Sequence, residues 1–473
     1  MLLHTCFCIK YTRAWFPYWT KIQRTSFLRI GSKERSKHAD CTALYSMRDE
    51  DSQPDILIQW RGEKSHGNSM KLRHFEFESA VEAVLDHPVS IHYEDALSSS
   101  SLGLDQYQSL AYENAMQFIS TESYISNEHL KKIGQRCSLI RAIFEIVAEG
   151  ESYQELAENA VKSGFLNDLM DEGDTSSNPT WRVRLRQYGE QSRPDKKAQY
   201  GKKMRSPMRM ERDAILQMGE LFIKFKGQVD LKHADVSIYI LEGLSHRSKL
   251  LARLLTKGAD TSSIAPTTRI CITNTPLDPL AAFTMCNVAK LKEHYRIFDP
   301  FAGSCAILLA ASMMEPTVKS VGVEIAHNGQ VNRGDIIRDF EMRNLTLPAE
   351  IIKGDSMKDS IRLHAKAAVG NEPFDAIITD PPYGIREKIG YCEVPPLVNL
   401  VRCIANDRKN NNRLLRVGGR LVAFVPNALG DDIELDMPSE ADLLDAGLVY
   451  RQMHEQPLND SLSRWLVEYE CVS

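Results

Sequence analysis

The pattern of hydrophobic and polar positions changes near Tyr295. After this residue, short β-rich runs alternate with apolar segments of helical period, such as residues 304–314 (SCAILLAASMM). Such alternation predicts a parallel, doubly wound α/β sheet. Residues 447–453 and 463–470 are two more β-rich runs and are predicted to form an antiparallel hairpin at the sheet edge. The β-rich runs of the sheet itself are YRIFDP (295–300), SVGVEI (320–325), AEIIKGD (349–355), DAIITDP (375–381) and RLVAFVP (420–426).

The first half of the chain mixes strands and helices in no regular order. Residues 56–60 (ILIQW) and 236–244 (VSIYILEGL) are typical of strands, and residues 151–164 of a helix that ends at the glycine cap Gly164. Residues 74–86 (HFEFESAVEAVLD) begin in a strand-like way and continue as an amphipathic helix. Without βαβ alternation, this half is predicted to be α+β.

Within residues 180–189 (TWRVRLRQYG), apolar and basic side chains alternate strictly between Trp181 and Leu185. This period of two predicts a half-buried strand with a cationic outer face. The apolar face holds Trp181, Val183 and Leu185, and the cationic face holds Arg182, Arg184 and Arg186.

Composition bounds the class of protein. The 473 residues are 43% hydrophobic, which is enough for several domains with full cores, and the net charge of −5 does not by itself indicate a nucleic-acid binder. The ten cysteines include no CxxC pair, so we expect reduced thiols in an intracellular protein and no structural zinc. No apolar run approaches the length of a membrane span, and no membrane association is predicted.

Residues 1–50 are rich in basic residues, and six lysines or arginines precede the first acid, Glu34. Such an N-terminus is typical of an organelle transit peptide, and equally of an ordinary disordered extension. We expect a cytoplasmic protein, or a mitochondrial or plastid one if residues 1–50 are a transit peptide.

Acidic residues follow consecutive predicted strands of the second half. Asp299 and Gly303 lie in the turn after the first strand, Glu324 ends the second, and Asp355 ends the third. An acid at the second strand end can accept the hydroxyl hydrogens of a ribose, and a small residue in the first turn lets the backbone approach a ligand. The glycine-rich pattern that binds a dinucleotide pyrophosphate is missing, so the pattern favours S-adenosylmethionine, whose cationic groups suit a carboxylate such as Asp299.

The fourth strand end carries two prolines, in the stretch from Asp375 to Gly384 (DAIITDPPYG). Pro381 and Pro382 cannot continue a sheet and so predict a rigid corner at the ligand-binding edge. There Asp380 and a proline carbonyl can hold the two hydrogens of an exocyclic amine, and Tyr383 can stack on a base. Rigid positioning of this kind supplies most of what a methyl transfer to an amine requires.

These motifs resemble the amino-group methyltransferases with a D/N-P-P-Y motif, and more closely the catalytic subunit of tRNA guanine-10 N2-methyltransferase. Residues 273–291 (TNTPLDPLAAFTMCNVAKL) look like the family's helix before the first strand. Residues 227–243 resemble its THUMP-domain strands, and residues 456–470 its C-terminal hairpin. The resemblance covers roughly residues 55–473.

The resemblance implies a division of the chain and a set of site residues. It implies a Rossmann-like methyltransferase domain over residues 291–473, linker helices over 246–290, a ferredoxin-like and THUMP-type α+β RNA-binding region over 51–245, and an N-terminal extension over 1–50. It implies catalysis by Asp380, Pro381, Pro382 and Tyr383, and contacts to S-adenosylmethionine from Asp299, Phe301, Gly303, Glu324, Asp355 and Asp380.

The family also works with a small zinc-containing activator subunit, so a heterodimer is implied. This chain departs from the family at Cys305, where glycine is common, and at Glu324, where aspartate is common. We expect Cys305 to narrow the turn and weaken cofactor binding, and Glu324 to serve in place of aspartate.

Residues 181–212 form a local basic segment within an acidic protein. They hold eleven lysines and arginines against three acids, a net charge of +8. Such a segment can bind RNA phosphates, although a solvated loop would have the same composition. The predicted tRNA contacts are Arg182, Arg184, Arg186, Lys196, Lys197, Lys202 and Lys203.

The sequence therefore predicts methyl transfer from S-adenosylmethionine to the exocyclic N2 amine of a tRNA guanine, at position 10 by the resemblance. A DNA amino-methyltransferase is one alternative, although it would carry a target-recognition domain in place of the THUMP-like segments. A catalytically inactive RNA-binding protein of the same fold is another, and Cys305 is the feature that favours it.

Overall fold

The computed structural model describes most of residues 55–473, which belong to one unit. The predicted extension of residues 1–50 lies outside the described residues. None of the described helices is both long enough and apolar enough to cross a membrane. The described ranges are 55–61, 70–98, 115–170, 178–189, 207–245, 249–273, 276–325, 331–382, 394–428, 433–459 and 462–473.

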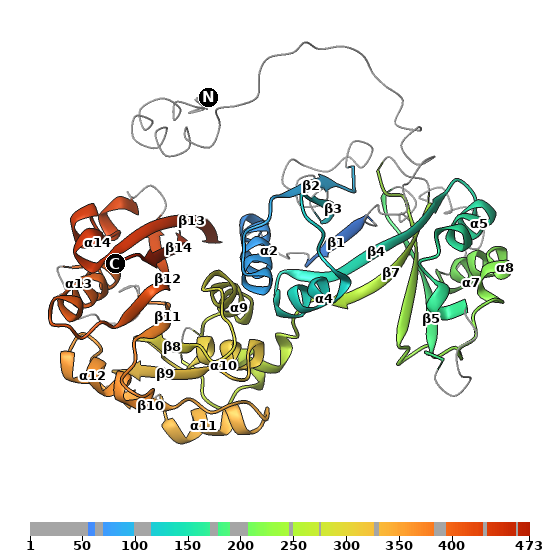
Figure 1. The fold of residues 1–473 in the computed structure, drawn as a ribbon. Helices are drawn as coiled ribbons and strands as arrows, with labels where there is room; N and C mark the ends of the chain where they lie inside the picture. The colour runs from blue at the N-terminus through green and yellow to red at the C-terminus, as the bar shows by residue number, and fades with distance from the viewer. Residues whose placement is uncertain are drawn as a thin grey trace, which may run out of the picture. The chain divides into compact units, whose positions relative to one another are not determined.

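A mixed sheet forms the centre of the C-terminal half. Within the described ranges it has seven strands in the spatial order β10-β9-β8-β11-β12-β14-β13 (Figure 1). The first five strands are parallel, and β14 pairs antiparallel with both β12 and β13. The predicted strands and the predicted edge hairpin are confirmed. The strands are β8 (Arg296–Asp299), β9 (Lys319–Glu324), β10 (Glu350–Lys353), β11 (Phe374–Thr379), β12 (Leu415–Ala428), β13 (Leu448–Asn459) and β14 (Leu462–Cys471).

Helices cover both faces of this sheet, as doubly winding requires. Side chains alternate between the faces with period two, so Ile378 packs in the cluster under α9, α10 and α11, while Ile377 packs in the cluster under α12, α13 and α14. Because both faces are buried, β11 is apolar at nearly every position. The helices are α9 (Pro279–Val288), α10 (Ala306–Met314), α11 (Arg333–Glu341), α12 (Asp359–Ala368), α13 (Pro396–Lys409) and α14 (Glu440–Ala446).

The first half of the chain forms a second mixed sheet. Its seven described strands lie in the order β2-β3-β1-β4-β7-β6-β5, and only β5 and β6 are parallel neighbours. This arrangement confirms the α+β prediction. The strands are β1 (Ile56–Trp60), β2 (Ile91–Asp95), β3 (Met116–Thr121), β4 (Ile140–Gly150), β5 (Trp181–Gln187), β6 (Val236–Glu242) and β7 (Lys249–Lys257).

Short helices pack against this sheet. The helix α5 (Tyr153–Ser163) ends as predicted at Gly164, whose φ of 71° is the left-handed conformation that glycine adopts without strain. The strand β5 also has the predicted alternation, because Val183 and Leu185 are buried and Arg186 is exposed. The other helices are α4 (Asn127–Arg136), α6 (Asn167–Met170), α7 (Pro207–Gln217) and α8 (Gly219–Phe222).

The predicted strand-like start of residues 74–86 is wrong, because α2 (Met70–Leu85) is helical throughout. Phe75 packs in the cluster of the methyltransferase-like sheet, whereas Phe77 packs in a cluster of the first sheet. A helix that serves two cores carries apolar residues on two sides, and the resulting spacing of two resembles a strand.

A buried carboxylate joins α2 to both halves of the unit. Glu76 is fully buried and accepts hydrogen bonds from the backbone N–H groups of Ser138 and Leu139, at 2.8 Å each. The side chain of Asn287, on α9, donates to the same carboxylate at 3.2 Å. Burial raises the pKa of Glu76, although these donors favour the charged form and counteract the rise.

The segment 246–290, predicted as linker helices, contains a strand. In the structure β7 pairs with β4 and β6 inside the first sheet, and two 3₁₀ turns follow it before α9. The run KLLARLLTK has apolar residues at spacings that suit a helix as well as a strand, and its pairing with distant strands decides the outcome.

Candidate active site

The carboxyl ends of four neighbouring strands bring the predicted acids to one edge of the sheet. In the spatial order of β10, β9, β8 and β11, the residues at or just after these ends are Asp355, Glu324, Asp299 and Asp380. The chain passes from β8 to β9 on one side and returns to β11 on the other, so β8 and β11 flank the point where the strand order reverses. Open α/β sheets bind their ligands at this point.

Asp299 lies at the centre of this edge and is 1% exposed. Its Oδ1 accepts hydrogen bonds from the Thr379 hydroxyl at 2.7 Å and from the Phe301 N–H at 3.1 Å. Burial raises its pKa to about 7, and the nearby charges of Asp380 and Glu324 add to the rise. The carboxylates of Asp299, Asp380 and Glu324 thus act on one another electrostatically, and such a site favours a cationic ligand.

Glu324 is tied to the turn after β8. Its Oε2 accepts a hydrogen bond from the Gly303 N–H at 2.8 Å, which links the end of β9 to the turn that opens α10. Gly303 has a φ of 50°, a conformation that is strained for residues with a side chain. The glycine is therefore required by its backbone angle, and the bond to Glu324 fixes where the turn lies.

The structure places the side chain of Cys305 in the hydrophobic core. Cys305 is fully buried in the cluster under α9 and α10. Its sulfur packs against Gly322 of β9, because a Cβ atom added to that glycine would lie 3.5 Å from the sulfur. The φ of 62° at Cys305 lies in the left-handed region, which glycine adopts more readily than cysteine does. The sulfur thus lies beneath the turn, on the core side, so the structure does not support the expected narrowing of the turn.

Asp355 caps its own turn. Its Oδ1 accepts a hydrogen bond from the Met357 N–H at 3.0 Å, and its carbonyl accepts one from the Lys358 N–H at 3.0 Å. These bonds give Asp355 a structural role in its turn, and its contact with the cofactor stays a prediction.

The proline corner follows β11 directly. Pro381 is buried, Pro382 is half-buried, and the Asp380 side chain is 22% exposed at the edge. Arg464, on β14, approaches Asp380 with Nη1 at 3.5 Å from Oδ2. The sequence analysis missed Arg464, although a basic residue within the buried strand 462–471 was a visible signal. Tyr383, the predicted stacking residue, lies outside the described residues.

Comparison with known proteins shows what the segment around this site is similar to. Residues 266–391, which include the row from Asp299 to Asp380, match the RMKL-like methyltransferase domain family. The chain is 27% identical over 284 residues to the tRNA (guanine(10)-N(2))-methyltransferase TRMT11 of Xenopus laevis, covering 55% of this chain and 54% of that protein. Over this part of its length the chain is similar in sequence to a protein named tRNA (guanine(10)-N(2))-methyltransferase.

A second relative carries the same name. The TRMT11 protein of Dictyostelium discoideum is 26% identical over 349 residues, which cover 66% of this chain and 65% of that protein. The chain therefore spans about half to two thirds of the length of these curated relatives. Among solved structures, TrmN from Thermus thermophilus aligns over 88% of this chain and 100% of its own, with 16% identity and a TM-score of 0.39.

All three predicted RNA-binding arginines make contacts within the protein, and Arg186 donates to the Leu185 carbonyl at 3.1 Å. Arg182 donates to the Ser237 hydroxyl at 2.9 Å, and Arg184 donates to the Leu231 carbonyl at 2.9 Å and to Glu211 at 3.2 Å. Arg186 is exposed. Lys196, Lys197, Lys202 and Lys203 lie outside the described residues.

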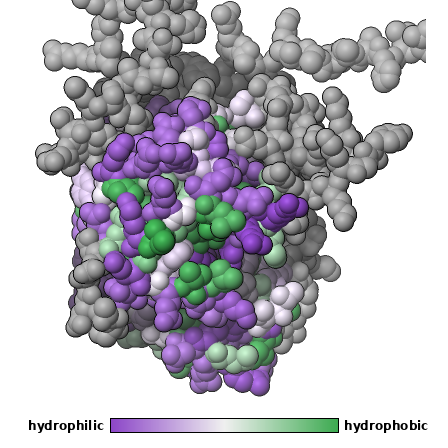
Figure 2. Space-filling view, turned by 90° about the vertical axis from the view of Figure 1, so that its right-hand side faces the viewer, coloured by the Kyte–Doolittle hydropathy of each residue, from purple (hydrophilic) through white to green (hydrophobic). Residues whose placement is uncertain are grey.

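The surface around α7 and α8 is mixed in character. Figure 2 shows the face at this end of the first sheet, where hydrophobic patches lie among hydrophilic side chains. Leu216, Ile223 and Leu231 contribute exposed apolar side chains to this region of the chain. The described part of the predicted RNA-binding region is thus not a uniformly cationic surface.

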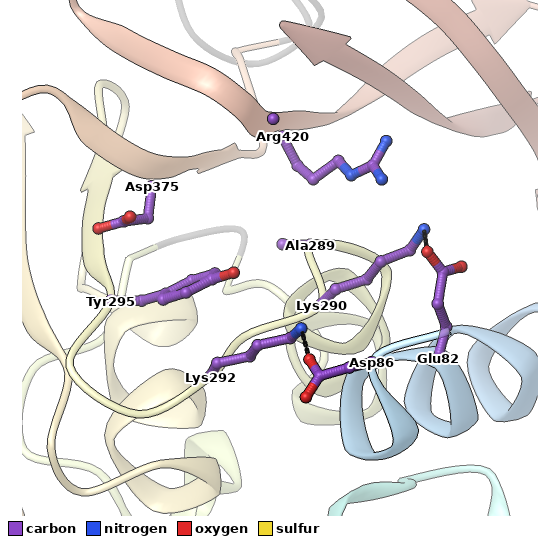
Figure 3. A pocket seen from close by; sticks show the side chains of 9 residues that line it. Glu82, Asp86, Ala289, Lys290, Lys292, Tyr295, Asp375 and Arg420 are labelled. Atoms are coloured by element: carbon purple, nitrogen blue, oxygen red, sulfur yellow. Dashed lines mark hydrogen bonds and ion pairs between the residues drawn. The ribbon is translucent and has the colours of Figure 1, made fainter. Parts of the chain in front are cut away.

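A small polar pocket lies at the opposite edge of the methyltransferase sheet. Its volume is about 110 Å³, and it is lined by residues near the amino ends of β8, β11 and β12, among them Tyr295, Asp375 and Arg420 (Figure 3). Lys290 pairs with Glu82 of α2 at 2.6 Å. Charged residues that line the pocket pair with one another, as Lys290 and Glu82 do. Ligands of such sheets bind at the carboxyl ends of the strands, so this pocket is not the candidate site.

Proposed function

We propose that this chain transfers a methyl group from S-adenosylmethionine to the exocyclic N2 amine of guanine 10 in tRNA. The row of acids from Asp355 to Asp380, ending in a rigid proline corner, is the observation that carries the proposal. Its relatives named tRNA (guanine(10)-N(2))-methyltransferase supply the substrate class and the position.

The residues present fit the cofactor. Asp299 and Glu324 offer carboxylate oxygens at the strand reversal, where burial raises the pKa of Asp299 and the charges of Asp380 and Glu324 add to the rise. The cationic amino and sulfonium groups of S-adenosylmethionine would place positive charge there, while Glu324 would accept hydrogen bonds from the ribose and Asp355 would hold the adenine. Phe301 and Gly303 form the turn beside it.

The protein's part in the reaction is to hold the amine. Asp380 accepts one N–H of the guanine amine and a proline carbonyl of the corner accepts the other, which directs the nitrogen lone pair at the methyl group. The bound cofactor supplies an electrophilic methyl group. The nitrogen lone pair held by Asp380 and the proline carbonyl would accept this methyl group, and the electron pair of the broken C–S bond would go to sulfur. The methylated amine then loses a proton to solvent, so no strong base is needed before attack.

The tRNA must present its base outside the stack. A guanine in a stem has its amine paired, so it must be flipped out at a cost of a few kcal/mol. Arg186 and the four lysines of the basic segment are the predicted phosphate contacts, and phosphate contacts position RNA without reading its sequence. Arg182 and Arg184 remain predicted contacts, although their intramolecular bonds limit their reach.

Two further expectations belong to this proposal. A small zinc-containing activator subunit is proposed as partner on the strength of the family resemblance, and co-purification of the tagged chain from its own cells tests it. A cytoplasmic location is proposed, with a mitochondrial or plastid one if residues 1–50 direct import. Fluorescent fusions with and without residues 1–50 distinguish these outcomes.

Incorporation of methyl groups into defined tRNA transcripts tests the proposed function. The purified chain, alone and with its co-purified partner, is incubated with radiolabelled S-adenosylmethionine and an unmodified transcript, followed by mass spectrometry of the nucleosides. We expect N2-methylguanosine at position 10. A transcript with inosine at that position lacks the amine and should accept no methyl group, and methylation of DNA instead would favour the alternative class of enzyme.

Asp380 provides the matching variant. We expect Asp380→Ala to lower kcat by about 100-fold or more, since the amine loses its acceptor, while the Kd for S-adenosylmethionine changes less than about threefold. Turnover close to that of the wild type would refute the assigned role.

A further inference from the structure

A row of side chains crosses the methyltransferase sheet on the same face as Asp380. Arg464 on β14 lies opposite Pro426 of β12 and opposite Gln456 of β13. Leu466 and Ile378 both pack in the cluster under α9 and α10. Arg464 precedes Leu466 by two residues and Asp380 follows Ile378 by two, so the period of two directs both charged groups to this face.

Three strands restrain the Arg464 side chain. Its Nε donates a hydrogen bond to Gln456 Oε1 at 2.8 Å, and its guanidinium carbon lies 3.8 Å from the centre of the Phe424 ring on β12. The third contact is Nη1 to Asp380 Oδ2, at 3.5 Å. A planar guanidinium that is stacked on a ring and bonded at Nε has little freedom left, so its third contact is fixed in direction.

The contact between Arg464 and Asp380 places a positive charge beside a carboxylate of the candidate site. Asp380 lies close enough to Asp299 for its charge to add to the rise that burial causes in the pKa of Asp299, and like charges disfavour the ionisation of one another. Arg464 approaches from the other side, where its 7% exposure means that water screens its charge little. A protonated Asp380 would lose part of its capacity to accept an N–H from the amine.

We propose that Arg464 is a positioning residue that holds the Asp380 carboxylate in its charged form and in a fixed orientation toward the substrate amine. This inference rests on the proposed function. Arg464 acts through Asp380 and does not itself contact the amine. It lies outside the 266–391 segment that matches the methyltransferase domain family, so the C-terminal hairpin completes the site.

The pH dependence of turnover tests the proposal, with Arg464→Met as the main variant. We expect kcat to fall about 10- to 100-fold while the KM values for tRNA and for S-adenosylmethionine stay within about threefold. We also expect the acid limb of the kcat profile to move to higher pH by about one unit, since the carboxylates lose their neighbouring cation. Arg464→Lys keeps the charge and should leave the acid limb in place.

A matched control comes from the same hairpin. Arg451 on β13 is 45% exposed and pairs with Glu470, so Arg451→Gln removes an arginine without touching Asp380. This variant should retain wild-type kcat and the wild-type acid limb. In an Asp380→Asn background, the Arg464→Met change should no longer move the acid limb.

The outcomes separate the inference from the proposed function. A wild-type chain that methylates no guanosine refutes the proposed function, and the inference fails with it. Wild-type methylation with an unchanged kcat and acid limb in Arg464→Met overturns the inference alone. If Arg464→Met does not fold, Arg464→Lys serves as the test. Its kcat should fall at least about threefold, because the lysine ammonium can neither stack on Phe424 as a planar group nor make the Nε hydrogen bond. A wild-type kcat in Arg464→Lys would then overturn the proposal.

Discussion

The burial of Asp299 predicts that the site is stabilised by removing its central carboxylate. Asp299 is 1% exposed and its pKa is raised to about 7 by burial, from a usual value of 3.8. Because Asp299 ionises at a lower pH in the unfolded chain than in the folded one, its contribution to stability is most favourable below pH 3.8 and falls as the pH rises to about 7. The substitution Asp299→Asn removes this ionisation.

The magnitude follows from the size of the shift. One pKa unit corresponds to about 1.4 kcal/mol, so a rise of roughly three units destabilises the ionised folded state by up to about 4 kcal/mol above pH 7. Asparagine keeps an oxygen that accepts from Thr379 and from the Phe301 N–H. We therefore expect Asp299→Asn to gain stability of that order at pH 8, and to gain little at pH 4.

Calorimetric melting of both proteins at pH 4, 6 and 8 measures this difference. Asp375→Asn is the matched control, since Asp375 is also largely buried. Burial alone would raise the pKa of Asp375, but hydrogen bonds from Arg296 and Arg416 outweigh it and lower the pKa. Its ionised form therefore stabilises the fold above the usual pKa of 3.8, and Asp375→Asn should lower the melting temperature at pH 8 and have little effect at low pH.

Cofactor binding should change in the opposite direction to stability. If Asp299 accepts from a cationic group of S-adenosylmethionine, Asp299→Asn should weaken binding by roughly 10- to 100-fold in a titration, the value of a charged hydrogen bond. An Asp299→Asn protein that melts at or below the wild-type temperature at pH 8 would refute the burial argument. Unchanged affinity would refute the cofactor contact.

Three further changes test separate parts of the structure. Glu76→Gln sets an amide N–H₂ against the Leu139 N–H and should destabilise the unit by about 1–3 kcal/mol in calorimetric melting, and an unchanged melting temperature would contradict the bridging role of α2. Cys305→Gly should change the Kd for S-adenosylmethionine less than about threefold, since the sulfur lies in the core, whereas tenfold tighter binding would show that the cysteine does narrow the turn. Replacing the four lysines of the basic segment with glutamine should weaken tRNA binding and flatten its dependence on salt, and an unchanged salt slope would assign the segment to a spectator loop. These lysines are Lys196, Lys197, Lys202 and Lys203.

Local pattern alone was sufficient for the elements of the C-terminal sheet. The five parallel strands are short β-rich runs with an acid or a proline at or near their carboxyl ends, and each signal lies within a few neighbouring residues. Reliance on neighbouring residues also explains why the start of residues 74–86 was wrongly predicted as strand-like, although α2 is helical there. Phe75 and Phe77 serve different cores, and a pattern confined to residues 74–86 cannot show that two cores exist.

By itself, the sequence determined which acids follow which strands and that a stiff corner follows β11, because both depend on residue type and chain order. Only the tertiary structure decided how those acids act on one another. The pKa of Asp299 depends on burial and on carboxylates 25 and 81 positions away, and Arg464 meets Asp380 only because β14 is inserted between β12 and β13. Charge interactions depend on distance in space, which the order of residues along the chain leaves open until the sheet has formed.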